Sequence, residues 1–371
     1  MFSAFQLDQV LLDNVKRAGY VKPTPIQASA IPPALAGRDV VATAETGSGK
    51  TAAFLLPLLQ RMSALPRGRV GGLVLCPTRE VALQTEHHAR RLSRRTGLRS
   101  AVIYGGVGFE PQIKALRAGA EIVVATPGRL LDHLGRGNVD LRGVSLLVLD
   151  EADRLLDMGF LPDLKRILAH LPAGRQTLLF SATMPPEILA LADRFMKNPA
   201  RVAVGRPATP PKTVSQGVYP VAPDQKTVFL LHLIRQETAE SVLVFTRTKH
   251  RADRLARQLT RAGVQAACLH GDRSQRQREA ALEGYRNGSF RVLVATDLAA
   301  RGLDIQGVTH VINYDLPAAP EDYIHRIGRT ARAGASGQAL SFVTADDARA
   351  LREIEKTLGH PLRRLGTGES V

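Results

Sequence analysis

Several residue types are scarce in this sequence, and each scarcity excludes a class of protein or site. Tryptophan is absent, and the two cysteines, Cys76 and Cys268, each lie in or beside an apolar run typical of a β-strand. Neither belongs to a CxxC pair or a histidine cluster, so we interpret both as reduced core thiols rather than a disulfide or a metal site. No uninterrupted apolar run reaches the ~20 residues that span a bilayer, and the N-terminus lacks the pattern of a signal peptide. We therefore expect a cytoplasmic protein with no membrane association.

Aromatic residues make up only 5% of the sequence, too few for the stacking platform with which some β-sheets hold single-stranded nucleic acid. Acidic residues are outnumbered, and the formal net charge is +16. The excess is shared along the chain, with 26 basic against 17 acidic residues up to Gly205 and 24 against 17 after it. A chain that is basic throughout is expected to bind a polyanion across both halves. An arginine-rich proteome would produce the same excess, so charge alone leaves both interpretations open.

Short apolar runs alternate with amphipathic helical segments, which is typical of parallel sheets with crossover helices. The runs expected to form strands are 39–44, 72–76, 100–105, 121–127, 145–150 and 176–182, then 241–246, 265–271, 291–297, 310–315 and 338–344. Several are apolar without alternation, as strands covered on both faces are. We predict an α/β protein with two domains, each a parallel sheet with helices on both faces. From the proline-rich stretch between the two sets of runs, the boundaries are domain 1–205, linker 206–212, domain 213–360 and tail 361–371.

A phosphate-binding loop is predicted at residues 44–51, AETGSGKT, between a strand and a helix. Its glycines let the backbone turn N–H groups toward phosphate oxygens, and the following helix adds its positive end. The pattern assigns Lys50 to the β- and γ-phosphates of a nucleotide and Thr51 to Mg²⁺. The remaining nucleotide contacts in the loop are assigned to Thr46, Gly47, Ser48 and Gly49.

Two adjacent acidic residues end the buried run VSLLVLDEAD. Asp150 suits Mg²⁺, through water, and Glu151 suits the polarisation of an attacking water. Two carboxylates after a strand could instead cap the next helix, because aspartate is a good N-cap. The phosphate loop upstream favours the catalytic interpretation.

From Asp150 the sequence reads Asp-Glu-Ala-Asp, which resembles the motif that names the DEAD-box RNA helicases, and other segments match that family in order over residues 2–359. The resemblance implies two tandem RecA-like domains and an ATP-dependent RNA helicase that uses ATP and Mg²⁺. Residues 19–27 look like the family's Q motif. By that resemblance Gln27 binds the edge of adenine and Tyr20 packs on its ring, which selects ATP over GTP.

The resemblance also implies an RNA-binding surface on each domain. The segments similar to the family's RNA- and nucleotide-facing motifs are PTRE at 77–80, GG at 105–106, TPGR at 126–129, VFTRTK at 244–249, HGD at 270–272 and ATDLAARGLDI at 295–305. The implied RNA contacts are Pro77, Thr78, Arg79, Gly106, Thr126 and Arg129 in the first domain, and Arg247, Gly271, Arg278 and Thr296 in the second. Contacts to the backbone provide affinity without reading the RNA sequence. Domain closure is implied to bend one strand, so that duplexes separate locally.

The second half contributes to the nucleotide site as well. Residues 325–334, HRIGRTARAG, resemble the motif that delivers arginine fingers, here Arg329 and Arg332. Gly302 and Asp304 are implied as further nucleotide contacts, Asp304 on the ribose hydroxyls. Because the phosphate loop and the acidic pair lie in the other domain, transition-state charge can be stabilised only when the domains close. The residues implied in coupling hydrolysis to closure are Asp153, Ser181, Thr183 and His325.

The chain departs from the family pattern at three positions without losing a catalytic group. Glu45 stands where glutamine is common, Val81 replaces the usual leucine, and Ala331 stands where glycine is common between the last two arginines. The sequence around 321–334 and 351–359 looks most like the bacterial RhlE-like branch. We expect a monomer that acts on RNA, with ribosome-assembly or RNA-decay proteins as further partners.

Two other functions fit a two-domain ATP motor. A DNA translocase shares the motor and the basic charge, although the full set of DEAD-box motifs favours RNA. A non-enzymatic RNA clamp would use ATP only to close, and such a clamp has no need of Glu151. Because Glu151 and both arginine fingers are present, the sequence predicts a hydrolase that acts on RNA.

Overall fold

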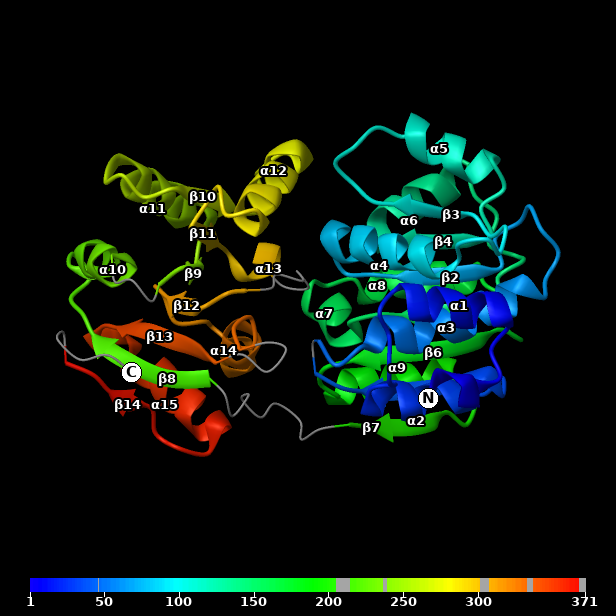
Figure 1. Cartoon of the computed structure of the whole chain (residues 1–371), viewed down its shortest axis with the longest axis horizontal. Helices are drawn as coiled ribbons and strands as arrows, with labels where there is room; N and C mark the ends of the chain where they lie inside the picture. Colours follow the sequence, from blue (N-terminus) through cyan, green and yellow to red (C-terminus); the bar gives the residue numbers. More distant parts are fainter. Residues whose placement is uncertain (46, 205–213, 236–238, 301–306, 332–335, 367–371) are drawn as a thin grey trace. The chain divides into compact units, whose positions relative to one another are not determined.

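The computed structural model describes residues 1–45, 47–204, 214–235, 239–300, 307–331 and 336–366. The chain forms two compact units, Met1–Pro207 and Ala208–Val371, which we call the N-terminal and C-terminal units. Each is a sheet that carries helices (Figure 1). The predicted linker, 206–212, lies outside the described residues. Within the described ranges, none of the helices has the length and hydropathy of a membrane span.

Seven parallel strands form the sheet of the N-terminal unit, in the order β3-β4-β2-β5-β6-β1-β7. The strands are β1 (Val40–Thr43), β2 (Gly72–Leu75), β3 (Ser100–Ile103), β4 (Ile122–Ala125), β5 (Leu146–Leu149), β6 (Gln176–Ser181) and β7 (Ala200–Ala203). The helices are η1 (Phe2–Phe5), α1 (Gln9–Arg17), α2 (Pro25–Leu35), α3 (Lys50–Ser63), α4 (Arg79–Leu92), α5 (Glu110–Arg117), α6 (Pro127–Gly135), α7 (Ala152–Asp157), α8 (Leu161–Ala169) and α9 (Pro186–Phe195).

Alternate residues of the central strands enter two hydrophobic cores, one on each face of the sheet. On β2, Val74 belongs to the core shared with α1 to α4, whereas Leu73 and Leu75 belong to the core shared with α6 to α9. Every residue of β2, β4 and β5 is buried. Burial on both faces explains why these strands are apolar without alternation, and it confirms the predicted coverage by helices.

The C-terminal sheet also has seven parallel strands, in the order β10-β11-β9-β12-β13-β8-β14. Its strands are β8 (Val214–Pro220), β9 (Val242–Phe245), β10 (Ala266–Leu269), β11 (Val292–Ala295), β12 (His310–Asn313), β13 (Gly337–Val343) and β14 (Arg363–Arg364). Its helices are α10 (Lys226–Ile234), α11 (Lys249–Arg261), α12 (Gln275–Arg286), α13 (Asp297–Ala300), α14 (Pro320–Ile327), η2 (Ala345–Asp347) and α15 (Ala348–Leu358). Position by position, this order repeats that of the N-terminal sheet. The two units therefore share one topology.

All the predicted strands are present, and the structure adds β7, β8 and β14. Strand β7 lies at the sheet edge beside β1 and is only half-buried. Strand β8 contains polar residues and Gly217, yet it pairs along its whole length with β13. Strand β14 lies within the segment 361–371 that we predicted as a tail, and the flanking Leu362 and Leu365 are buried. Strands β7 and β14 form sheet edges and β8 lies between β13 and β14, and all three depend on backbone pairing, which leaves no apolar run in the sequence.

Candidate nucleotide and RNA sites

The phosphate loop, the acidic pair and the predicted coupling residue Ser181 lie at the ends of three neighbouring strands. The phosphate loop follows β1, the acidic pair follows β5, and Ser181 ends β6. The N–H of Ala44 donates a hydrogen bond of 3.1 Å to the carbonyl of Ser181, which joins the first and third of these segments. Carboxyl ends of parallel strands meet at one edge of a sheet, where α/β proteins bind ligands.

The phosphate loop folds as its glycines require. Gly47 and Gly49 have φ of +86° and +96°, a region that other residues disfavour. A Cβ at Gly49 would also lie 2.5 Å from Nε2 of Gln27. Lys50 is buried at the start of α3, and its Nζ donates to the carbonyl of Ala44 at 2.6 Å. A bound phosphate would compete with this carbonyl for the ammonium group.

Gln27 connects α2 to the phosphate loop. Its Oε1 accepts a hydrogen bond from the N–H of Thr24, and its Nε2 donates to the carbonyl of Gly49, both at 3.0 Å. One N–H and one lone pair of the amide remain for a ligand, which is what a bidentate contact with adenine requires. Tyr20 is half-buried, with its ring centroid 6.1 Å from that of Phe2.

Asp150 lies in an environment that disfavours its charge. The carboxyl is buried just after β5, and burial, together with the neighbouring charge of Glu151, raises the pKa of Asp150 to about 7, while Lys50 acts in the opposite direction. A divalent cation would supply the positive charge that this buried carboxylate lacks. Thr51, the other predicted Mg²⁺ ligand, is half-buried in the first turn of α3.

Glu151 adopts a left-handed backbone conformation, with φ of +48° and ψ of +56°. For a residue other than glycine this costs about 1–2 kcal/mol, and such strain clusters at functional sites. The N–H of Glu151 donates to Oδ1 of Asp150, and its Oε2 accepts from Nη1 of the buried Arg154, both at 3.0 Å. The carboxylate of Glu151 is thereby held in one orientation.

The raised pKa of Asp150 predicts that this residue destabilises the ligand-free protein above neutral pH. The folded state holds the proton up to about pH 7, whereas the unfolded chain releases it near pH ~4. The folded state thus binds more protons between these values, and stability falls as the pH rises through them. We expect Asp150→Asn to stabilise the ligand-free protein by about 4 kcal/mol at pH 8 and by about 1.5 kcal/mol at pH 5.

Thermal unfolding without Mg²⁺ or nucleotide, at both pH values, measures this difference. The control is Asp193→Asn, at an exposed aspartate that is paired with Arg201; it should show no such pH dependence. An equal gain for Asp150→Asn at pH 5 and pH 8 would exclude charge as the cause.

Asp153 links the acidic motif to the loop after β6. Its Oδ2 accepts hydrogen bonds from the N–H groups of Ala182 and Thr183 and from Oγ1 of Thr183, at 3.1, 2.8 and 3.0 Å. Its own N–H donates to Oγ of Ser181 at 3.0 Å. The structure thus brings together three of the predicted coupling residues, whereas the fourth, His325, belongs to the C-terminal unit.

The predicted RNA contacts of the N-terminal unit follow the strands on the other half of the same sheet edge. Pro77, Thr78 and Arg79 follow β2, Gly106 follows β3, and Thr126 and Arg129 follow β4. Arg79 lies against Gly106, which has φ of +83°, and a Cβ there would overlap the guanidinium. The loops after β2 and β3 therefore meet.

Arg129 contacts the loop after β3 rather than extending freely into solvent. Its side chain is largely buried, and its Nη1 donates to the carbonyl of Val107 at 2.8 Å. Its guanidinium lies 4.2 Å from the ring centroid of Phe109, and that of Arg136 lies 4.1 Å from the same centroid. These are cation–π contacts, and they fix the position of Arg129.

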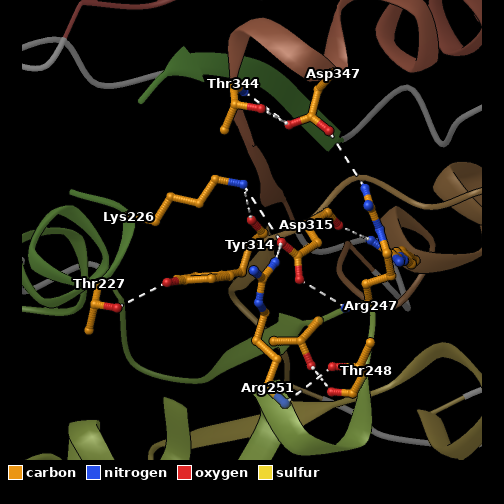
Figure 2. A network of polar contacts seen from close by, with 11 residues as sticks. Lys226, Thr227, Arg247, Thr248, Arg251, Tyr314, Asp315, Thr344 and Asp347 are labelled. Carbon is orange, nitrogen blue, oxygen red and sulfur yellow. Dashed lines mark hydrogen bonds and ion pairs between the residues drawn. The ribbon is translucent and has the colours of Figure 1, made fainter. Parts of the chain in front are cut away.

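Figure 2 shows that Arg247, a predicted RNA contact of the C-terminal unit, belongs to a polar network around the buried Asp315. The N–H of Arg247 donates to Oδ2 of Asp315 at 3.0 Å, and its exposed guanidinium lies 3.6 Å from Oδ1 of Asp347. Oδ1 of Asp315 accepts from Arg251 and lies 3.7 Å from Nζ of Lys226. Sequence reasoning missed Asp315, although the run 310–315 ends on an acid as the run 145–150 does.

The other predicted RNA contacts of this unit repeat the layout of the N-terminal unit. Arg247, Gly271 and Thr296 follow β9, β10 and β11, three neighbours in the second sheet. Arg278, on α12, is buried, and its Nη1 donates to the carbonyl of His270 at 3.3 Å. Its contact therefore holds the loop that presents Gly271.

The predicted arginine-finger motif begins in the last turn of α14, and Arg329 follows the end of that helix. Arg329 is buried, and its Nε donates to the carbonyl of His325 at 3.3 Å. The neighbouring Arg326, which the sequence did not single out, binds both carboxylate oxygens of Asp297 and donates to Oδ1 of Asn313 at 2.9 Å. It anchors the helix to the sheet edge. The predicted site residues outside the described ranges are Thr46, Gly302, Asp304 and Arg332.

Two regions of the chain match families of known proteins. Residues 24–191 match the DEAD/DEAH box helicase family, and residues 225–334 match the helicase conserved C-terminal domain. Over 364 residues, the chain is 43% identical to the DEAD-box ATP-dependent RNA helicase CshA of Geobacillus kaustophilus, covering 98% of this chain and 78% of that protein. The chain belongs to the DEAD-box helicase family.

Other DEAD-box proteins are similar to this chain in sequence and in structure. The chain is 45% identical over 364 residues to DEAD-box ATP-dependent RNA helicase 30 of Arabidopsis thaliana, covering 96% of this chain and 62% of the plant protein. A structure of S. cerevisiae Dbp5 bound to RNA and ADP BeF3 is 31% identical, with a TM-score of 0.89, covering 99% of this chain and 96% of that one. A structure of Mss116p bound to ssRNA and AMP-PNP is 29% identical, with a TM-score of 0.89, covering 100% and 79%. The two sheets are the tandem RecA-like domains of this helicase family.

One departure from the DEAD-box pattern places a residue other than glycine in a strained backbone conformation. Ala331 stands where glycine is common, and its φ is +55°. We expect Ala331→Gly to stabilise the protein by about 1 kcal/mol, because glycine adopts this conformation without a Cβ clash. Chemical denaturation measures the change. The control, Ala350→Gly inside α15, should instead destabilise by about 1 kcal/mol. Destabilisation by Ala331→Gly would show that its side chain matters more than backbone strain.

Proposed function

We propose that this chain is an RNA-stimulated ATPase that opens short RNA duplexes locally and remodels RNA or RNA–protein complexes. The observation that carries the proposal is the division of one sheet edge in the N-terminal unit. Residues suited to ATP follow β1 and β5, the coupling residues Ser181 and Thr183 end or follow the adjacent β6, and residues suited to the RNA backbone follow β2, β3 and β4. ATP and RNA would therefore bind to neighbouring halves of one layer.

On the ATP half, Lys50 would bind the β- and γ-phosphates, helped by backbone N–H groups of residues 46–49. Gln27 and Tyr20 would bind adenine and select ATP over GTP. Glu151 would orient and polarise the attacking water. Its support by the buried Arg154 favours this role, because a general base must be held within reach of the proton that it takes.

Thr51 and Asp150 would hold Mg²⁺. A hydroxyl and a carboxylate are oxygen donors of the type that Mg²⁺ prefers, and the raised pKa of Asp150 supports a place for positive charge there. When bound, Mg²⁺ neutralises charge that develops on the transferred phosphoryl group. The task of the chain itself is to keep the carboxyl of Asp150 buried beside the phosphate loop.

The C-terminal unit would complete the site through Arg329, Arg332, Gly302 and Asp304. The first two would stabilise the transition state as arginine fingers, so hydrolysis would require closure of the two units. RNA bound to both units would favour the closed state through its higher affinity for that state. ATP hydrolysis would be coupled to closure through contacts of Asp153, Ser181, Thr183 and His325.

The proposed organisation follows the sequence analysis. The first domain would span 1–205 and the linker 206–212, and the second domain would begin at 213 and extend past the predicted end at 360 to include β14. We further propose membership of the RhlE-like branch, a cytoplasmic monomer, and partners among ribosome-assembly or RNA-decay proteins. The positive charge of both halves supports a backbone-binding mode that accepts many RNA sequences.

Titration of RNA with and without a non-hydrolysable ATP analogue tests the proposal. RNA affinity should rise with the analogue by a factor of roughly 5–150, and RNA should raise analogue affinity by the same factor. The salt concentration is kept fixed, because phosphate contacts are sensitive to salt. DNA of the same sequence serves as the control and should show a smaller coupling. Equal RNA affinities with and without the analogue would disprove coupled closure.

A further inference from the structure

A cluster of metal-ligating side chains lies beside β10, an edge strand of the C-terminal sheet. Asp253 lies on α11, Cys268 on β10 and His270 directly after β10, where α11 and β10 are neighbours (Figure 1). One donor atom from each residue lies within 4.8 Å of the other two. Among the residues that the structure describes, this is the one such set with three potential ligands.

The three donor atoms already lie close to the positions of three ligands around one metal ion. Sγ of Cys268 and Nε2 of His270 each lie 3.1 Å from Oδ1 of Asp253. Ligand bonds of about 2.0–2.3 Å in a tetrahedron place neighbouring donors about 3.3–3.8 Å apart. The two pairs that include Oδ1 of Asp253 would need to separate by only a few tenths of an ångström to admit an ion, and Sγ of Cys268 lies within 4.8 Å of the imidazole nitrogen.

His270 supplies an independent indication of a missing ligand. The side chain is only 2% exposed, and neither ring nitrogen has a hydrogen-bond partner within the described part of the chain. Nε2 points toward Asp253 but lacks the geometry of a hydrogen bond. A buried imidazole whose Nδ1 has no hydrogen-bond partner and whose Nε2 has only a misaligned contact with a carboxylate costs free energy, and a metal bond at Nε2 would remove part of that cost.

In the absence of an ion, Arg273 places its positive charge on the same atoms. Its Nη2 donates to Sγ of Cys268 at 2.8 Å and also to Oδ1 of Asp253. The Arg273 side chain is one-third exposed, so it can move into solvent. Burial, followed by the hydrogen bond to Asp253, raises the pKa of the Cys268 thiol to about 11.

We propose that Asp253, Cys268 and His270 bind one Zn²⁺ ion, which displaces Arg273. Zn–S, Zn–N and Zn–O bonds form, the S–H bond of Cys268 breaks, and its proton passes to solvent. Thiolate and imidazole together favour Zn²⁺ over Mg²⁺ or Ca²⁺, and water fills the fourth position. The isolated cysteine gave no such indication in the sequence, because its partners come from another helix and a following loop. The site requires neither ATP nor RNA, so it stands independently of the proposed function.

Titration of the full, untagged chain with Co²⁺, without nucleotide or RNA, tests the site. A thiolate-to-cobalt charge-transfer band should saturate at one equivalent, and Zn²⁺ should then abolish it. Histidines elsewhere do not contribute to a sulfur band. Cys268→Ser should remove the band and weaken Zn²⁺ binding, measured by competition with a chromophoric chelator, by at least roughly 10–100-fold. Cys76→Ser, at the other buried free cysteine, should bind both ions as wild type does.

Two further variants sharpen the test. Asp253→Asn, at a partly exposed position that should fold if Cys268→Ser does not, should also weaken Zn²⁺ binding. Arg273→Gln should tighten it by about tenfold, because a competing charge is removed. The proposal is overturned if wild type shows no saturable band, if Cys268→Ser or Asp253→Asn binds Zn²⁺ as tightly as wild type, or if Arg273→Gln binds it more weakly.

Discussion

Replacing Glu151 with glutamine is expected to lower kcat for RNA-stimulated ATP hydrolysis by roughly 10²–10⁴-fold, the usual contribution of a general base. The amide keeps the shape of the side chain, and its oxygen can still accept the 3.0 Å hydrogen bond from Arg154. The left-handed backbone at Glu151 and its contact with Asp150 should therefore persist. Affinities for ATP and RNA are expected to match wild type, so the whole loss falls on kcat.

Single-turnover hydrolysis at saturating RNA, together with equilibrium binding of ATP and RNA, separates the two effects. A matched control is Glu353→Gln, at an exposed glutamate on α15, which should hydrolyse ATP at the wild-type rate. Near-normal turnover in Glu151→Gln would remove this residue from the mechanism. A loss of ATP affinity equal to the loss of rate would assign it to binding instead.

Arg332→Ala is expected to abolish most of the stimulation by RNA, by roughly 10³–10⁵-fold, which is the contribution of an arginine finger in related phosphoryl transfer. ATP binding should survive, because the phosphate loop lies in the other unit. The expectation rests on the finger motif and on the fixed position of Arg329, three residues earlier, which is buried against the carbonyl of His325.

Steady-state ATPase rates with and without RNA measure this effect, and fluorescent-nucleotide binding measures the retained affinity. The control is Arg352→Ala, at an exposed arginine of α15, which should keep full stimulation. If Arg332→Ala responds to RNA as wild type does, the fingers are not Arg332 and the split active site has to be assigned differently.

The predicted strands illustrate what local sequence can establish. Strands such as β2 and β5 are short apolar runs buried on both faces, and their composition alone separates them from the helices. Strands β7, β8 and β14 escaped prediction because their stability depends on pairing with β1, β13 and β8. A strand at a sheet edge, or next to one, needs no continuous apolar run, so nothing in its own residues distinguishes it from a loop.

The candidate site likewise has features that the sequence identifies and features that it does not. Lys50, Asp150 and Glu151 could be identified from their order after apolar runs, because the backbone chemistry of a phosphate loop is local. The contact between Gln27 and the carbonyl of Gly49 spans 22 residues of sequence, so it could not be identified in this way. The strained backbone of Glu151 could not be predicted from the sequence either, because the sheet and α7 together impose it.

By itself the sequence determined the fold class, the order of the motifs and the resemblance to the DEAD-box helicases, because each depends on short segments whose composition and spacing carry the information. Only the tertiary structure decided which distant side chains meet. It placed Asp315 at the centre of a charged network with Arg247, and it gathered Asp253, Cys268 and His270 around one point. The physical reason is that such contacts are set by the packing of helices against sheet edges, and side chains 15 or more residues apart in the chain have no local signature of their meeting.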